Sequence, residues 1–379
     1  MIQLLLAILF FLLSLLCIFP APEYHLWYVS ILTTEFPWIF ILILLPFFFW
    51  VNKAKKFRII SLSTSAVALV LFLSPIVRAF SVSANLRQEL QTALGAPGDS
   101  ETERPFSMLR MFSGIGEPEL PYQTFIYSNP ENKALTLDYY HSQVTGIRPC
   151  VIVIHGGSWA GGDSRQLPEL NTVLAEHGYN VAAISYRLAP KHIYPAQIED
   201  IKAAINYLRR NALELEVDTT QFVLLGRSAG AQLAMDAAYN FNDAGIRGAI
   251  NFYGPADMVW GYLNPANPLV IDSKSVMEDF LGGTSEEVPE NYRHSSATYA
   301  VTRSTVPTLT IHGKNDPLVA YEHAVRLNDS LERKGIPHYL LSLPWATHGC
   351  DYTLNGPSGQ LTTYSVLYFL ESVFPQGED

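Results

Sequence analysis

The segment Gly226-Arg227-Ser228-Ala229-Gly230 is the most informative part of this sequence. The apolar run Phe222–Leu225 precedes it, and a helical pattern over 231–238 follows it. A serine between two glycines, where a buried strand meets a helix, is typical of a nucleophile elbow, a tight turn that exposes the serine hydroxyl. Both flanks require glycine because a Cβ there would collide with neighbouring backbone. We therefore expect Ser228 to be a nucleophile.

A second glycine-containing turn lies upstream, at the end of the apolar run Cys150–Ile154. A continuous apolar run is expected of a strand buried on both faces of a parallel sheet. This run ends in His155-Gly156-Gly157. Acyl transfer develops negative charge on a carbonyl oxygen, and preorganised backbone N–H groups stabilise that charge. We predict that the donors are the amide of Gly156 or Gly157 together with the amide of Ala229.

Two polar turns follow predicted strands downstream, one carrying Asp316 and the other His348. The chain order Ser228, Asp316, His348 differs from the orders in the two large serine-protease classes. A serine hydroxyl needs a neighbouring base, and an imidazole can take its proton and return it to the leaving group. A carboxylate fixes the imidazole tautomer. We expect His348 to be the base and Asp316 to orient it.

Other polar residues compete for these roles. His155 and His312 lie inside strand-end motifs, which favours backbone organisation over a role as base. Asp351 could supply the carboxylate instead of Asp316. Because it lies only three residues after the predicted base His348, it is better placed to brace the loop that carries this base. Glu199 and Asp200 open a predicted helix, where an acidic side chain suits the helix dipole.

Residues from about 120 to 375 resemble an α/β-hydrolase of the carboxylesterase and hormone-sensitive-lipase-like type. The motifs that carry the resemblance are His155-Gly156-Gly157, Tyr186-Arg187-Leu188-Ala189-Pro190, Tyr194-Pro195-Ala196, Gly226-Arg227-Ser228-Ala229-Gly230, His312-Gly313, Asp316-Pro317 and His348-Gly349. The resemblance implies a serine hydrolase acting on carboxylic esters through an acyl-enzyme, without a metal or organic cofactor. Two alternatives stay open: an amidase, formamidase or peptidase, and a non-catalytic membrane-tethered binding protein on the same fold.

Two positions depart from the pattern of that family. Ser158 stands where a third oxyanion glycine is common, and Arg227 stands before the nucleophile where Asp is common. Esterases with His-Gly-Gly-x-Trp also occur, so the first departure does not threaten activity. The second puts the close subfamily in question and leaves a non-lipid ester or a small amide open as the substrate.

Short apolar runs alternate with helical patterns in the second part of the chain. The predicted strands are 124–127, 135–140, 150–154, 181–185, 222–225, 249–252, 308–311 and 339–343. Such alternation predicts the α/β-hydrolase fold as a mostly parallel eight-stranded sheet with helices on both faces. Active sites collect at the carboxyl ends of such strands. We expect a catalytic domain over 122–379, with a lid insertion at about 254–305, where turn formers and aromatic residues interrupt the alternation.

The first eighty residues have the composition of a membrane anchor. Apolar stretches cover 4–19, 26–51 and 59–77, and a spanning helix needs about 20 apolar residues. We expect about three transmembrane helices within 1–80, followed by a connector or cap over 81–121. The first stretch could instead be a cleaved signal peptide, but it lacks a basic start and a small-residue cleavage site, which favours a retained helix.

Charge divides the chain in the same way. Residues 1–80 hold five of the 25 basic and two of the 35 acidic residues, which leaves the remainder with a net charge of −13. An acidic body argues against nucleic-acid binding. The cluster Lys53, Lys55, Lys56 and Arg58 predicts a cytoplasmic loop and hence a catalytic domain on the non-cytoplasmic side. The anchor suggests a substrate at the membrane or in the exported compartment, such as a lipid, an acylated glycan or a small ester.

Overall fold

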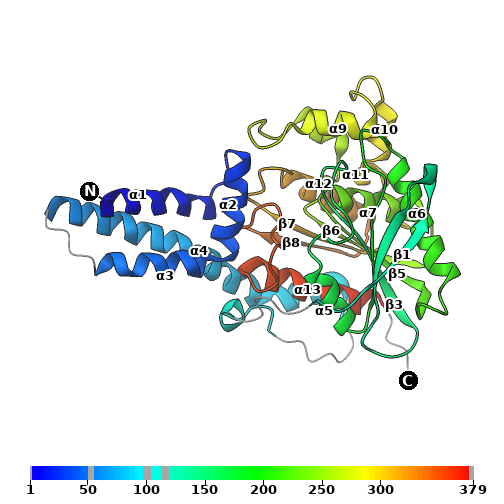
Figure 1. Ribbon diagram of the computed structural model, residues 1–379, viewed down its shortest axis with the longest axis horizontal. Coiled ribbons are helices and arrows are strands. Elements are labelled where there is room, and N and C mark those ends of the chain that lie inside the picture. The colour runs from blue at the N-terminus through cyan, green and yellow to red at the C-terminus, as the bar shows by residue number, and fades with distance from the viewer. Residues whose placement is uncertain (1, 50–54, 97–103, 113–118, 375–379) are drawn as a thin grey trace.

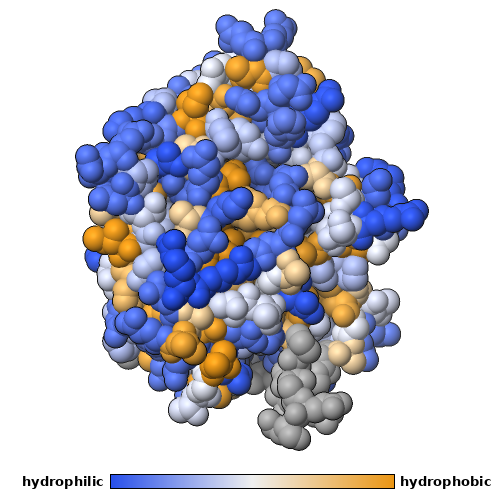
Figure 2. All heavy atoms as spheres, turned by 90° about the vertical axis from the view of Figure 1, so that its right-hand side faces the viewer, coloured by the Kyte–Doolittle hydropathy of each residue, from blue (hydrophilic) through white to orange (hydrophobic). Residues whose placement is uncertain are grey.

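The structure is a computed structural model that describes residues 2–49, 55–96, 104–112 and 119–374. Figure 1 shows a body built around one β-sheet and a bundle of helices that projects from one side of it. Figure 2 shows the face of the body turned away from the bundle, which is mostly hydrophilic with scattered apolar side chains.

The sheet has eight strands in the order β1-β2-β4-β3-β5-β6-β7-β8. Its strands are β1 (Gln123–Ser128), β2 (Leu135–Tyr140), β3 (Arg148–Ile154), β4 (Asn180–Ile184), β5 (Val217–Arg227), β6 (Ile246–Phe252), β7 (Thr308–Gly313) and β8 (His338–Leu343). β2 pairs antiparallel with both β1 and β4, and the pairs from β4 to β8 are all parallel. The predicted mostly parallel, eight-stranded sheet is confirmed.

Strand β3 explains why the central runs are apolar throughout. Ile152 and Ile154 belong to one hydrophobic core and Val151 and Val153 to the other. Successive side chains of a strand point to opposite faces, so a strand covered on both faces must be apolar at every position. The helices over the first face are α6 (Ala196–Arg210), α7 (Ala229–Asn240) and α12 (Glu322–Lys334). Those over the second are α4 (Lys55–Leu94), α5 (Glu169–Glu176) and α13 (Pro357–Val373).

The segment between β6 and β7 carries four short helices and coincides with the insertion expected at about 254–305. These helices are α8 (Met258–Leu263), α9 (Ser273–Leu281), α10 (Pro289–His294) and α11 (Ala297–Ala300). Figure 1 shows α9 and α10 at one end of the body, beyond the edge of the sheet. The insertion therefore stands beside the carboxyl ends of the parallel strands.

The N-terminal bundle consists of α1, α3 and the first part of α4, with α2 lying across the end nearest the body (Figure 1). Its elements are α1 (Ile2–Ser14), η1 (Leu15–Cys17), α2 (Tyr24–Glu35), α3 (Pro37–Leu44) and η2 (Leu45–Phe48). Phe40 of α3 stacks on Phe72 of α4, with ring centroids 4.9 Å apart. Aromatic packing of this kind holds the antiparallel helices together.

The number of candidate spans is smaller than the three that we expect from the sequence. Within the described residues, only Phe57–Leu94 is long and apolar enough by itself to cross a bilayer. Tyr24–Glu35 and Pro37–Phe48 pass the same test only together, and they are bent by 80° at their junction. Ile2–Cys17 is shorter than a span. The structure therefore supports one candidate span, or two if the bent pair counts as one.

The bend lies at Glu35 and Pro37, and it has both a local cause and a contact with the body. Pro37 occupies the first turn of α3, where its missing N–H does no harm, but it cannot continue α2. Glu35 is buried against the body. Its carboxylate accepts one hydrogen bond from the Ser358 amide at 3.0 Å and another from the Ser358 hydroxyl at 2.6 Å. The second apolar stretch therefore changes direction to reach the first turn of α13.

Helix α4 joins the bundle to the body without interruption. Leu86 and Leu90 in its second part are fully buried in the core beneath the sheet. Tyr339 of β8 also donates a hydrogen bond to Glu89 at 2.6 Å. The boundary expected at residue 80 thus falls inside one continuous helix. Within the expected connector, residues 97–103 and 113–118 lie outside the described residues, and Leu109–Phe112 forms the 3₁₀ turn η3.

Candidate active site

Ser228 lies in a strained turn between β5 and α7. Its φ of 52° and ψ of −120° fall where non-glycine residues rarely occur. A Cβ at Gly226 would collide with the carbonyl of Gly230, and one at Gly230 would collide with the carbonyl of Ile154. The turn is therefore as tight as an elbow requires, and both glycines are needed for steric reasons.

The His155-Gly156-Gly157 turn packs directly against this elbow. A Cβ on Gly156 would come within 2.8 Å of the Arg227 carbonyl oxygen, which explains the glycine there. The Gly156 amide, however, donates to Oε1 of Gln166 at 2.6 Å. It is thus not free to bind an oxyanion, and of the two predicted glycine donors only Gly157 remains.

Asp316 and His348 are brought together from the loops after β7 and β8. Nδ1 of His348 lies 2.7 Å from Oδ2 of Asp316, and both side chains are buried. The other carboxylate oxygen of Asp316 accepts hydrogen bonds from the amides of Leu318 and Val319, each at 2.9 Å. The carboxylate is therefore fixed on one side by backbone and on the other by the imidazole.

The pKa of Asp316 lies below its usual value. Burial alone would raise this pKa, but the neighbouring His348 and His312 lower it by more. The carboxylate accordingly stays ionised at neutral pH, which is the state needed to hold the Nδ1 proton of an imidazole.

The competing histidines occupy supporting positions, as expected. His155 stacks on Tyr186, with centroids 4.2 Å apart, and its Nδ1 lies 2.7 Å from the carbonyl oxygen of Gly156. Nε2 of His312 lies 2.9 Å from the carbonyl oxygen of Val319 and 3.3 Å from Oδ2 of Asp316. Both imidazoles therefore organise the loops that carry the site.

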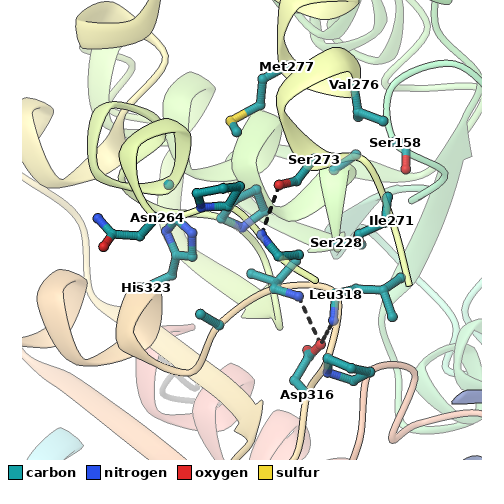
Figure 3. A pocket seen from close by; sticks show the side chains of 18 of the residues that line it. Ser158, Ser228, Asn264, Ile271, Ser273, Val276, Met277, Asp316, Leu318 and His323 are labelled. Atoms are coloured by element: carbon teal, nitrogen blue, oxygen red, sulfur yellow. Dashed lines mark hydrogen bonds between the residues drawn. The ribbon is translucent and has the colours of Figure 1, made fainter. Parts of the chain in front are cut away.

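A cavity of about 130 Å³ opens beside the elbow. Ser228 and Ala229 line it from the sheet edge, together with Asp316. Figure 3 shows Val276 and Met277, both from α9, on the side of the cavity away from Asp316. Ser158, which stands where the family commonly has a third glycine, also lines the cavity (Figure 3).

The cavity wall also contains His323, which is buried and neutral at physiological pH. Burial lowers its pKa to about 3, with His312 adding to the effect. Its Nδ1 accepts a hydrogen bond from the Asp257 amide at 3.2 Å. Among the residues that the structure describes, no group of three or more His, Cys, Asp or Glu side chains is arranged to hold a metal ion.

Arg227 and Asp351 form a buried ion pair next to the nucleophile. Nε of Arg227 lies 2.5 Å from Oδ2 of Asp351, and both side chains are almost inaccessible to solvent. The other carboxylate oxygen accepts a hydrogen bond from the hydroxyl of Tyr253 at 2.6 Å. Asp351 therefore does not orient His348 but binds the residue before Ser228. This pair accounts for Arg227 at a position where the family commonly has Asp.

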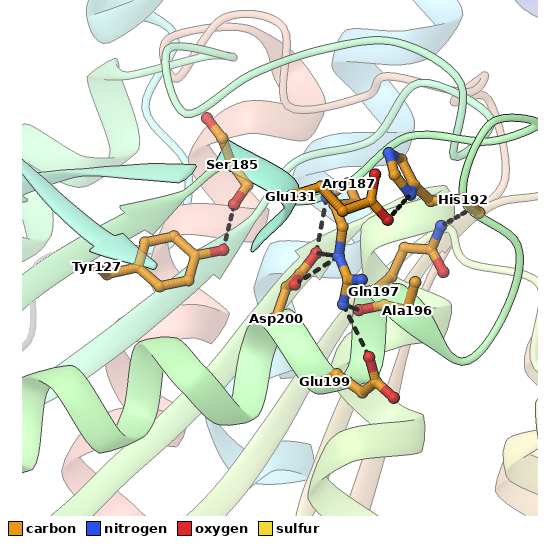
Figure 4. A network of polar contacts seen from close by, with 9 residues as sticks. All are labelled: Tyr127, Glu131, Ser185, Arg187, His192, Ala196, Gln197, Glu199 and Asp200. Carbon is orange, nitrogen blue, oxygen red and sulfur yellow. Dashed lines mark hydrogen bonds and ion pairs between the residues drawn. The ribbon is translucent and has the colours of Figure 1, made fainter. Parts of the chain in front are cut away.

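Glu199 and Asp200 belong to a separate polar network around Arg187 (Figure 4). Nε of Arg187 lies 2.9 Å from Asp200, and its Nη2 lies 2.9 Å from Glu199 and 2.9 Å from the Ala196 carbonyl oxygen. The network ties the loop after β4 to the first turn of α6. Its carboxylates are thus engaged in structure and not in the predicted triad.

Sequence reasoning misses one contact to the predicted base. Nε1 of Trp27, in α2, donates a hydrogen bond to the backbone carbonyl of His348 at 2.9 Å. The two rings pack edge to face, with centroids 6.0 Å apart. The aromatic cluster of α2 is visible in the sequence, but nothing local indicates that it reaches a loop 321 residues away.

This chain is similar to known proteins in both sequence and structure. The profile of a family called BD-FAE matches residues 137–331, which is just over half of the chain. Among curated relatives, "Probable carboxylic ester hydrolase LipM" from Mycobacterium tuberculosis is 26% identical. The alignment covers 73% of this chain and 66% of the length of LipM. "Acetyl esterase" from Salmonella typhi is 31% identical over 40% of this chain and 47% of its own. The alignments thus span about half to two thirds of these relatives.

Solved structures share the fold of the body. A truncated carbohydrate esterase from gut microbiota superposes with a TM-score of 0.56 at 21% identity, covering 68% of this chain and 99% of its own. Propionate-bound esterase 2 of Thermogutta terrifontis gives a TM-score of 0.55 at 21% identity, over 69% and 98% of the two chains. The matched relatives and neighbours are named as esterases.

Proposed function

Because this chain belongs to the BD-FAE family, we propose that it is a serine hydrolase that cleaves carboxylic esters, with Ser228, His348 and Asp316 as its triad. The observation that carries the proposal is the 2.7 Å contact between His348 and Asp316, where Asp316 lines the same cavity as the strained Ser228 elbow. Relatives named as carboxylic ester hydrolase and acetyl esterase support the ester specificity.

In the proposed reaction, the Ser228 hydroxyl oxygen attacks the ester carbonyl carbon while its proton passes to Nε2 of His348. Asp316 holds the opposite ring nitrogen and stabilises the imidazolium. Collapse of the tetrahedral intermediate breaks the ester C–O bond, and the alcohol leaves with the proton from His348. Water then attacks the acyl-enzyme and gives its proton to His348. The second collapse releases the acid and returns the proton to Ser228.

The proposed oxyanion donors are the backbone amides of Gly157 and Ala229. Ala229 is the first residue of α7, and the first amides of a helix have no acceptor within the helix. Preorganised donors of this kind typically contribute about 3–4 kcal/mol each to lowering the barrier.

The N-terminal bundle, in this proposal, anchors the enzyme in a membrane with the body on the non-cytoplasmic side. Lys55 and Arg58 begin α4 at the end of the bundle far from the body (Figure 1). The basic end and the body therefore lie at opposite ends of the candidate span, as the positive-inside rule requires for this topology. Protease protection in sealed vesicles tests it, since digestion of the body from the cytoplasmic side would contradict the proposal.

Ser228→Ala tests the catalytic proposal directly. We expect hydrolysis of 4-nitrophenyl butyrate to fall by at least about 10⁴-fold, and labelling by a fluorophosphonate probe to disappear. Ser273→Ala is the matched control, because Ser273 lines the same cavity but lies outside the elbow, and it should keep the label. Full activity of Ser228→Ala would refute the triad. Rates on an ester and an amide with the same acyl group separate an esterase from an amidase.

A further inference from the structure

Helix α2 connects the bundle to two walls of the site. The amide of Tyr24 donates to the carbonyl of Leu269 at 3.1 Å, and Asn267 donates through its side chain to the carbonyl of Pro22 at 3.1 Å. At its next turn, Trp27 binds the carbonyl of His348. The start of α2 is therefore attached both to the α8–α9 loop and to the loop of the predicted base.

The α8–α9 loop is itself part of the cavity wall. Asn264, Pro265, Ala266 and Ile271 of this loop line the cavity beside Ser228. Figure 3 shows Asn264 and Ile271 bordering it, with Ser273 bonded to the loop backbone. Because α2 lies across the end of the bundle (Figure 1), the wall of the cavity has a fixed position relative to the candidate span.

Large apolar and aromatic side chains are exposed on α2, at the last residue of α8 and in the α8–α9 loop. We call this set the α2 collar: Tyr24, Leu26, Tyr28, Leu263 and Leu269. Tyr28 is 49% and Leu269 68% exposed, and the hydroxyls of Tyr24 and Tyr28 lie 2.9 Å apart. Tyrosine favours the membrane–water interface, where its ring meets hydrocarbon and its hydroxyl meets water. α2 lies across the end of the bundle (Figure 1), and the bundle exposes apolar side chains such as Leu12 of α1 and Leu42 of α3. A bilayer around the bundle would therefore reach α2.

The cavity has the size to hold a short hydrocarbon chain. At about 130 Å³ it is slightly smaller than an apolar protein cavity of about 150 Å³ that accommodates benzene. Its apolar lining includes Ile271, Met277 and Leu318, which suits a few methylene groups. With the acyl group in the cavity, a long hydrocarbon in the substrate would belong to the alcohol part and lie outside the cavity.

We infer that the enzyme accepts short-chain acyl esters of membrane amphiphiles, with the acyl group in the cavity and the alcohol's hydrocarbon lying in the bilayer beside the α2 collar. This inference rests on the proposed ester hydrolysis. It assigns α2 a role beyond anchoring, since the helix aligns the cavity with the membrane surface from which the ester comes.

The test uses the full chain in phosphatidylcholine vesicles and measures released acetate from two substrates with the same acyl group. Hexadecyl acetate resides in the bilayer, and ethyl acetate is dissolved in water. We expect at least a tenfold higher kcat/KM for hexadecyl acetate. A third ester, hexadecyl palmitate, should release no measurable palmitate. In Leu269→Glu and Tyr28→Glu, the ratio of the two acetate rates should fall at least tenfold. The control is Leu213→Glu, at an 89% exposed position three residues after the end of α6, the helix on the side of the body away from the bundle (Figure 1). In this variant the ratio should stay unchanged.

The outcomes separate this inference from the proposed function. If the unaltered enzyme does not hydrolyse ethyl acetate, the proposed function of ester hydrolysis is itself contradicted. If ethyl acetate is hydrolysed but hexadecyl acetate is no better a substrate, or if the ratio is unchanged in both collar variants, only the inference is overturned. Rapid cleavage of hexadecyl palmitate would overturn the limit to short acyl groups. Each variant's melting temperature, measured beside the unaltered chain, identifies loss of activity through unfolding.

Discussion

The two parts of α4 place similar side chains in opposite surroundings. Leu86 and Leu90 are fully buried by the body, whereas Val70, nearer the basic end, is 64% exposed although it is equally apolar. The exposed face of the body turned away from the bundle is mostly hydrophilic (Figure 2). A water-soluble protein rarely exposes a long contiguous apolar surface. The body is stabilised by its own core, and the exposed apolar side chains of the bundle support the proposal that a membrane surrounds it.

The largest effect that we predict belongs to the body. Asp316→Asn keeps the shape of the side chain but removes the charge that holds the imidazole tautomer of His348. We expect kcat to fall by about 10³–10⁴-fold, measured with 4-nitrophenyl butyrate in detergent. Asp351→Asn should not reproduce this loss if Asp351 acts only through Arg227. Equal losses in the two variants would contradict the separate roles given to the two carboxylates.

The second prediction concerns the stability of the buried Arg227–Asp351 pair. Asp351→Asn leaves a buried guanidinium without its anion, so the free energy of unfolding should fall by about 3–5 kcal/mol. Replacing both partners by apolar residues, as Arg227→Met with Asp351→Leu, should restore most of it. The control is Asp243→Asn, since Asp243 pairs with Arg209 at 2.6 Å near the surface and should lose less than about 1 kcal/mol. Denaturant titration of the full chain measures all three variants, and equal losses for Asp351→Asn and Asp243→Asn would contradict the prediction.

The third prediction tests the bundle. Val70→Lys places a charge midway along the candidate span, which should disfavour membrane insertion by about 2.5–3.5 kcal/mol. The fraction of the chain that resists alkaline extraction from membranes should drop accordingly. Leu213→Lys adds the same charge to the body and should leave that fraction unchanged. If Val70→Lys also left it unchanged, the bundle would not be a membrane anchor.

The last prediction is a pH dependence within the body, where the change expected for each pH unit is small. The pKa of His323 is lowered to about 3 in the fold, whereas in the unfolded chain it takes its ordinary value near 6.5. Below pH 6.5 the unfolded state therefore binds a proton that the folded state does not, and the free energy of unfolding declines by about 1.4 kcal/mol per pH unit down to about pH 3. His323→Gln should flatten this decline between pH 6.5 and 4.5 in denaturant titrations. An unchanged slope would mean that His323 is not neutral in the fold.

The elements that the sequence predicted are those with local causes. The eight strands follow from apolar runs, because a strand covered on both faces has no polar side. The elbow at Ser228 follows from the steric need for glycine at Gly226 and Gly230. The insertion near 254–305 follows from a break in the alternation of strands and helices. Each of these signals lies within about fifty residues of chain.

The elements that the sequence missed depend on distant contacts. The hydrogen bond of Gly156 to Gln166 excludes one predicted oxyanion donor, and no motif indicates it. Arg227 and Asp351 are 124 residues apart, and only the fold shows that they pair. The apolar stretch over 26–51 resembles a straight span until Glu35 is seen bound to Ser358 across 323 residues.

By itself, the sequence determined which residue types stand at the carboxyl ends of the strands, and in which order, because apolar periodicity and glycine sterics act over short distances. Only the tertiary structure decided which polar groups meet and which amides stay free. It also decided that α2 reaches from the N-terminal bundle to both the cavity wall and the His348 loop. These outcomes depend on how helices and loops far apart in the chain pack around the sheet. Local sequence patterns do not predict that packing.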